Sequence, residues 1–171
     1  MSMLKGEKGF TMLEAMVSVM IMSIMVILTM QAFTTGSRMW DVTYTSSRLA
    51  GESRMAVERI SRELRNSALT RISIPQTGVL QFQVPSSVDT NGNITWSGWF
   101  QYNIGGLDNE QLIRQDLTAG TSTVVANKVT TLQFVSNANP PTLTVNLTVQ
   151  DATDYGTVIP VPLSTTVELR N

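Results

Sequence analysis

Residues 9–33 read GFTMLEAMVSVMIMSIMVILTMQAF, and this stretch decides the fold of the chain. Between Glu14 and Arg38 no residue carries a charge, and as a helix these 23 residues would span roughly 34 Å. A bilayer's hydrocarbon core is about 30 Å thick, so the run predicts a transmembrane helix. The alternative is a buried helix of a soluble domain, but no later helical pattern is apolar enough to cover it.

A short polar leader, MSMLKGEKG, precedes the run and contains Lys5 and Lys8. A secretory signal peptide has the opposite order, with the cleavage site after its apolar stretch. Lysines ahead of a membrane span favour retention of that end in the cytoplasm. We therefore expect a single-pass membrane protein, with the chain after Arg38 outside the cytoplasm.

The junction between leader and run resembles the processing motif of type IV pilins and type II secretion pseudopilins. The resemblance rests on the basic leader, the Gly9–Phe10 pair, Glu14 at the fifth position after the junction, and the uncharged run. It implies cleavage after Gly9 by a prepilin peptidase and methylation of the new amine of Phe10. Residues 1–9 would be removed as a leader peptide.

Glu14 is a carboxylate at the edge of an apolar span, where a charge is costly unless it is paired. Cleavage after Gly9 would create a cationic amine on Phe10, and a neighbouring subunit could supply that amine to Glu14. The resemblance implies the same pairing during filament assembly. The alternative is an unpaired carboxylate that reaches back to the membrane interface.

Beyond the span the pattern becomes amphipathic, which predicts that the helix continues from Thr11 to about Ser67. Its outer half would pack on a sheet. We divide the chain into a leader at 1–9, a transmembrane half-helix at 10–36, an amphipathic half-helix at 37–74 and a sheet domain at 75–171. The apolar positions that recur at three- and four-residue steps are Leu49, Ala56, Val57, Ile60, Leu64 and Ala68.

After Ile74-Pro75 the apolar period changes to two, which is typical of half-buried strands. Such alternation favours antiparallel pairing with one face on the helix. The predicted fold class is therefore α+β, with one long N-terminal helix packed on a small antiparallel sheet, as in the pilin-like fold. The predicted strands cover residues 79–84, 94–102, 111–115, 129–135, 143–149 and 165–169.

Composition narrows the functional classes. The chain has no cysteine and no histidine, which excludes disulfides, thiolate zinc sites and His-based triads. No nucleophile–base pair is visible, so we expect neither an enzyme nor a cofactor.

Residues 38–71 contain seven arginines, which suggests either a basic patch for DNA or a solvated helix face. Because acids alternate with these arginines, we favour the solvated face and expect no nucleic-acid partner.

The order of elements is similar to that of minor pilins and J-type minor pseudopilins. Major pseudopilins often bind calcium in a C-terminal acidic loop, which makes Asp151 and Asp154 weak metal candidates, but two acids beside a glycine are more often an ordinary turn, and we favour the turn. Major pilins often close a C-terminal disulfide loop, which this chain cannot form. K-type minor pseudopilins typically lack the glutamate that Glu14 supplies.

Two hypotheses follow from these patterns. The first is a minor subunit of a type IV pilus or a type II secretion pseudopilus, with sibling pilins or pseudopilins and an inner-membrane assembly platform as partners. The second is a pilin-like tip module that binds DNA, a surface or secreted cargo.

Overall fold

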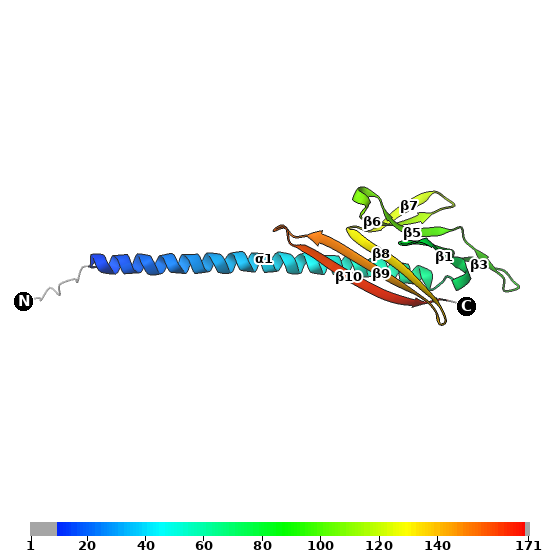
Figure 1. The fold of residues 1–171 in the computed structure, drawn as a ribbon, viewed down its shortest axis with the longest axis horizontal. Helices are drawn as coiled ribbons and strands as arrows, with labels where there is room; N and C mark the ends of the chain where they lie inside the picture. Colours follow the sequence, from blue (N-terminus) through cyan, green and yellow to red (C-terminus); the bar gives the residue numbers. More distant parts are fainter. Residues whose placement is uncertain (1–9, 170–171) are drawn as a thin grey trace, which may run out of the picture. The chain divides into compact units, whose positions relative to one another are not determined.

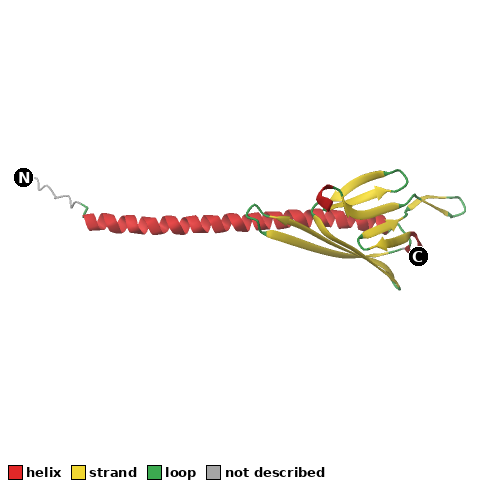
Figure 2. Cartoon of the chain, turned by 45° about the horizontal axis from the view of Figure 1, so that its top comes forward, coloured by secondary structure: helices red, strands yellow, loops and turns green. Residues whose placement is uncertain are grey.

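The computed structural model describes residues 10–169, so the predictions for the leader, including Gly9, lie outside it. The chain divides into two compact units, residues 1–41 and 42–171, and each is described by itself. Helix α1 (Met12–Leu64) supplies the described secondary structure of the first unit and the start of the second (Figure 1). Every strand belongs to the second unit (Figure 2).

In the first unit, α1 is apolar around its whole circumference and none of residues 10–41 is buried. Within the described residues, one helix is long and apolar enough to cross a membrane, and no residue of its apolar segment is buried in the protein. A helix that is apolar on all sides needs either a protein interior or lipid around it. The first unit provides no such interior.

In the second unit, α1 buries one stripe against the sheets. The stripe confirms five of the predicted apolar positions and adds three small polar ones, and Ala68 is partly buried. The helix ends at Leu64 rather than at Ser67, because Asn66 N–H donates to Glu63 O and Ser67 N–H to Leu64 O, which tightens the last turn. The buried residues of α1 are Thr45, Leu49, Ser53, Ala56, Val57, Ile60, Ser61 and Leu64.

Ten strands follow, and every strand pair is antiparallel, as the alternating pattern predicts. The first sheet has the order β1-β2-β5-β6-β7, the second β10-β9-β8, and β3 and β4 form a separate ribbon. Of two short 3-10 helices, η1 joins α1 to β1 and η2 joins β5 to β6. The elements are η1 (Leu69–Arg71), β1 (Ile72–Gln76), β2 (Val79–Phe82), β3 (Pro85–Val88), β4 (Ile94–Trp96), β5 (Phe100–Gly105), η2 (Leu107–Asn109), β6 (Gln111–Asp116), β7 (Thr121–Ala126), β8 (Val129–Ala138), β9 (Pro141–Ala152) and β10 (Val158–Glu168).

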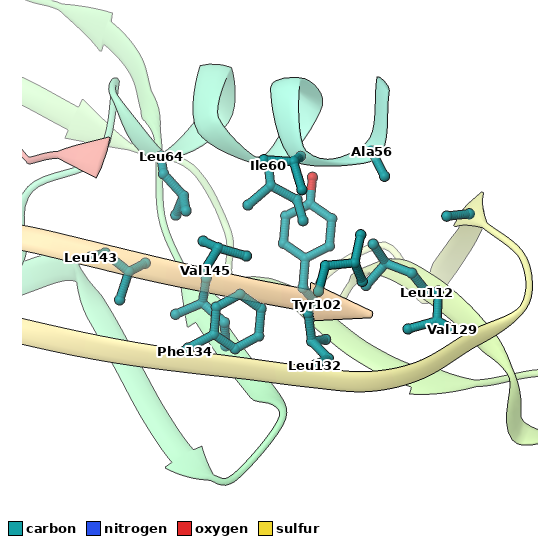
Figure 3. Packing of buried hydrophobic residues seen from close by; sticks show 14 of the residues in the cluster. Ala56, Ile60, Leu64, Tyr102, Leu112, Val129, Leu132, Phe134, Leu143 and Val145 are labelled. Atoms are coloured by element: carbon teal, nitrogen blue, oxygen red, sulfur yellow. The ribbon is translucent and has the colours of Figure 1, made fainter. Parts of the chain in front are cut away.

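One core joins the helix stripe to the inner faces of both larger sheets. Ile60 and Leu64 point toward Tyr102 and Val145, which come from different sheets (Figure 3). All four side chains are fully buried. The Tyr102 ring stacks on Phe82 with 5.5 Å between the ring centroids. The α+β, pilin-like fold predicted from the sequence is thus confirmed.

Strand β10 is longer than the predicted segment 165–169, because two prolines conceal its first half in the sequence. Leu169 N–H donates to Pro141 O. Because hydrogen-bonded pairs alternate along an antiparallel ladder, the odd-numbered residues of β10 direct their N–H and C=O groups toward β9. Pro160 and Pro162 are even-numbered, so the N–H that each lacks would point away from the sheet. An edge strand tolerates proline at such positions.

Three other strand predictions needed correction. The predicted strand 94–102 is two strands, β4 and β5, because Ser97 Oγ accepts the Val84 N–H at 3.1 Å and holds the chain where it leaves the ribbon. Strand β1 (Ile72–Gln76) was not predicted, because residues 72–74 were assigned to the amphipathic segment and the first strand to residues 79–84. Strands β3 and β7 were also not predicted, because their exposed residues show no regular alternation of buried and exposed side chains.

Candidate assembly and processing site

The start of α1 is fixed by Thr11, which the sequence pattern had assigned to the helix itself. Thr11 Oγ1 accepts the Glu14 N–H at 3.3 Å, and Thr11 O accepts the Ala15 N–H at 3.1 Å. Thr11 is therefore the N-cap and Glu14 stands three positions into the helix. A threonine followed three residues later by glutamate is a known capping pattern, so the sequence did contain this signal.

Glu14 and Phe10 are both exposed at this end of α1. The backbone of Glu14 is engaged, since its N–H donates to Thr11 and its carbonyl accepts the Ser18 hydroxyl at 2.8 Å. Its carboxylate lies in the first helical turn, where the helix dipole favours a negative charge by about 0.3–1 kcal/mol. The Glu14 side chain is thus exposed at the start of the helix. Gly9 lies outside the described residues.

Four hydroxyl groups of the span donate hydrogen bonds to carbonyl groups of the helix itself. Ser18, Ser23 and Thr29 each donate to the carbonyl four residues earlier at 2.8 Å, and Thr34 donates to Gln31 O at 3.0 Å. This is the usual arrangement of Ser and Thr in apolar helices. The side-chain hydroxyls therefore add little polarity to the outer surface of the span.

Asp151, one of the two weak metal candidates, is engaged by cations of the chain. Arg48 Nη2 contacts its Oδ2 at 2.6 Å and Lys128 Nζ lies 3.9 Å from its Oδ1. The hydrogen bond from Arg48 holds the pKa of the Asp151 carboxyl below its ordinary value, and the same bond raises the pKa of Arg48. A calcium ion at Asp151 would have to displace the Arg48 guanidinium.

Asp154 lies in the turn between β9 and β10, which closes through Gly156 N–H to Thr153 O at 2.8 Å. Among the residues that the structure describes, no three His, Cys, Asp or Glu side chains lie close enough together to hold a metal ion. The structure therefore offers the two aspartates no further acidic ligand in residues 10–169.

A polar cluster that the sequence pattern does not reveal joins the end of α1 to the first sheet. Glu63 Oε2 accepts Arg114 Nε at 2.8 Å and the Tyr102 hydroxyl at 3.0 Å, and Arg59 lies 3.7 Å from the other oxygen. Burial, reinforced by the negative charge of Glu63, raises the pKa of Tyr102 well above its ordinary value. Arg114 also covers the ring of Phe100 at 4.0 Å.

This cluster explains part of the helix charge pattern. Arg59 and Glu63 stand four residues apart, which the sequence shows, but Glu63 and Arg114 are 51 residues apart, which only the fold brings together. Arg48 likewise pairs with Glu52 on its own helix and with Asp151 across the domain. Arg48 and Arg59, two of the seven arginines considered for DNA binding, therefore have acidic partners in the same chain.

Comparison with known proteins adds one finding. Residues 4–30 match the model of the prokaryotic N-terminal methylation motif. A search of curated proteins and a search of solved structures each found no match. The matched residues cover part of the leader and most of the apolar run, and a motif of this kind begins the chains of type IV pilins and pseudopilins. A leader of this class implies processing by a prepilin peptidase, and with the single apolar helix it is consistent with an inner-membrane prepilin.

Proposed function

We propose that this chain is a minor pilin-like or pseudopilin subunit that is stored in the inner membrane and assembled into a type IV pilus or a type II secretion pseudopilus. The observation that carries the proposal is the apolar, exposed segment of α1, residues 15–33, most of which lies within the matched methylation motif at residues 4–30. Lipid covers such a surface before assembly. Apolar helices of sibling subunits would cover it afterwards.

Processing is the first step of this function. The prepilin peptidase would cleave the Gly9–Phe10 bond on the cytoplasmic side and methylate the Phe10 amine. Intact-mass measurement of the membrane-extracted protein tests this step. The expected chain begins at N-methyl-Phe10, and Gly9→Val is expected to remain uncleaved.

Assembly is the second step, and Glu14 would direct it. Its exposed carboxylate stands in the first turn of the helix, where the methylated amine of Phe10 from a neighbouring subunit could reach it. In apolar surroundings an ion pair is strongly favoured over two separate charges, since an unpaired charge there is costly. The pairing would therefore align each new subunit on its neighbour within the assembly platform.

The assignment as a minor subunit rests on the similarity in the order of elements. The sequence has no cysteine for the disulfide loop that is frequent in major pilins. The aspartate at the position of a C-terminal calcium loop is paired with Arg48 instead. Both departures favour a minor subunit, of a pilus or of a pseudopilus.

The deciding experiment is Glu14→Ala in cells that make the filament. The variant is expected to insert in the membrane and to be cleaved, because the scissile bond and the apolar run are unchanged. Its amount in sheared filament fractions, relative to the membrane pool, should fall sharply, and Glu14→Asp should restore only part of it. Ser23→Ala is the matched control, since that hydroxyl bonds to Val19 O within the helix. Wild-type incorporation of Glu14→Ala would contradict the pairing.

A further inference from the structure

A hollow on the surface of α1 lies at the end of the apolar run. Phe33, Gly36, Ser37 and Trp40 line it. The two aromatic rings stand seven residues apart on one face of the helix, and they are 74% and 76% exposed. A side chain at Gly36 would meet no atom within 4 Å, so the hollow is open between the rings.

The two rings lie on opposite sides of the boundary between uncharged and charged residues. Phe33 belongs to the uncharged run, whereas Trp40 follows Arg38 and precedes Asp41. Tryptophan combines a large apolar surface with one N–H donor, and in membrane proteins it is enriched at the level of the lipid headgroups. A chain position between apolar and charged residues suits that side chain.

The length of α1 relates Trp40 to the other end of the span. Glu14 and Trp40 are separated by 26 residues, which is about 39 Å along a helix at about 1.5 Å per residue. A bilayer including its headgroup regions is about 40–45 Å thick. When Trp40 lies in one interfacial region, Glu14 therefore lies in the opposite one, and neither is forced into the hydrocarbon.

We propose that Phe33 and Trp40 form an anchor that binds phospholipid of the outer leaflet of the inner membrane and fixes the depth of the helix. The Phe33 ring contacts acyl chains, an acyl chain enters the hollow over Gly36, and the Trp40 N–H donates to an ester carbonyl or phosphate oxygen. The anchor holds the Gly9–Phe10 junction at the cytoplasmic surface, where the peptidase acts. This inference rests on the proposed function in requiring that α1 span the membrane and that the peptidase cleave the Gly9–Phe10 bond.

The anchor can be tested with the tryptophan itself, in the full-length chain reconstituted in phosphatidylethanolamine–phosphatidylglycerol vesicles. Trp96→Phe together with Trp99→Phe leaves Trp40 as the only tryptophan of the chain. Lipids brominated near the headgroup are expected to quench Trp40 more than lipids brominated near the acyl-chain ends. Stronger quenching by the deep bromines, or none by either, overturns the proposal. The difference between the wild-type and Trp40→Phe signals gives the same readout without altering β4.

Cleavage provides a second test, in membranes that contain the prepilin peptidase. Trp40→Ala is expected to slow cleavage of the Gly9–Phe10 bond, and Trp40→Tyr, which keeps a ring and a donor, should restore it. Met39→Ala is the control at the adjacent position, which is also exposed. Equal cleavage of the Ala and Tyr variants would overturn depth control. If the proposed filament function fails instead, processed protein will be absent from filaments while the quenching and cleavage results remain as expected.

Discussion

Replacing Tyr102 by phenylalanine should lower the stability of the sheet domain by an amount that depends on pH. The Tyr102 ring is fully buried against Phe82, so phenylalanine keeps the packing and removes only the hydroxyl. A hydrogen bond to a charged acceptor contributes about 1.5–3 kcal/mol. Glu63 keeps its bond to Arg114 in the variant, so we expect a loss at the lower end, about 1.5 kcal/mol near pH 8.

The sign of the pH effect follows from the raised pKa of Tyr102. The folded domain keeps this proton at a pH where the unfolded chain, with an ordinary pKa of about 10, loses it. The stabilisation is thus complete below about pH 10 and is lost as the pH rises toward the folded-state pKa. At pH 11 the free energy of unfolding of the wild type is lower by about 1.4 kcal/mol, because the unfolded chain has released the Tyr102 proton. This decrease nearly equals the cost of Tyr102→Phe at pH 8.

Urea unfolding of the full chain in detergent micelles, followed by near-ultraviolet circular dichroism, measures both quantities. Wild type and Tyr102→Phe should differ clearly at pH 8 and nearly coincide at pH 11. Tyr44→Phe is the control, because that ring is exposed and its loss should change the free energy of unfolding little at either pH. A gap between wild type and Tyr102→Phe that is the same at both pH values would refute the reasoning.

Three further outcomes are expected. Ile60→Ala should destabilise the domain by about 2–5 kcal/mol in the same urea assay, because the side chain is fully buried in the core. Asp151→Asn should cost less than about 1 kcal/mol at pH 7, since the pair with Arg48 is partly exposed. The pKa of Asp151 is lower in the folded domain than in the unfolded chain. The difference in stability between wild type and Asp151→Asn should therefore shrink as the pH falls below the ordinary value of about 4, and it should vanish once the pH lies below the folded-state pKa. Deleting residues 1–33 should leave a soluble monomer with mixed helix and strand circular dichroism, and persistent aggregation would show that an exposed sheet face requires a partner.

The elements that sequence reasoning predicted correctly are those with a strong local period. The stripe through Leu49 and Ile60 repeats at helical spacing, and β9 alternates along its length, so burial on one face leaves a readable pattern. Strand β7 was missed because it is an edge strand whose side chains are mostly exposed on both faces. For β10, the prolines argued against a strand until its place at a sheet edge was known.

The candidate site divides in the same way. Glu14 and its place after the Gly9–Phe10 junction follow from sequence alone, because the motif is contiguous. The Thr11 cap was readable but was overlooked. The cluster at Glu63 could not be predicted, since Arg114 reaches it only through the pairing of β5 with β6 and the packing of that sheet on α1.

The prolines of β10 also limit how copies of this domain can associate through the edges of their sheets. A foreign strand that approaches the outer side of β10 meets carbonyl oxygens at Pro160 and Pro162 but no hydrogens to bind. Sheet-to-sheet growth, the route to amyloid-like aggregates, therefore has no continuous template along that stretch. In the proposed filament, which packs many such domains side by side, the apolar helices can then determine the arrangement of subunits without competition from intermolecular strand pairing at this edge.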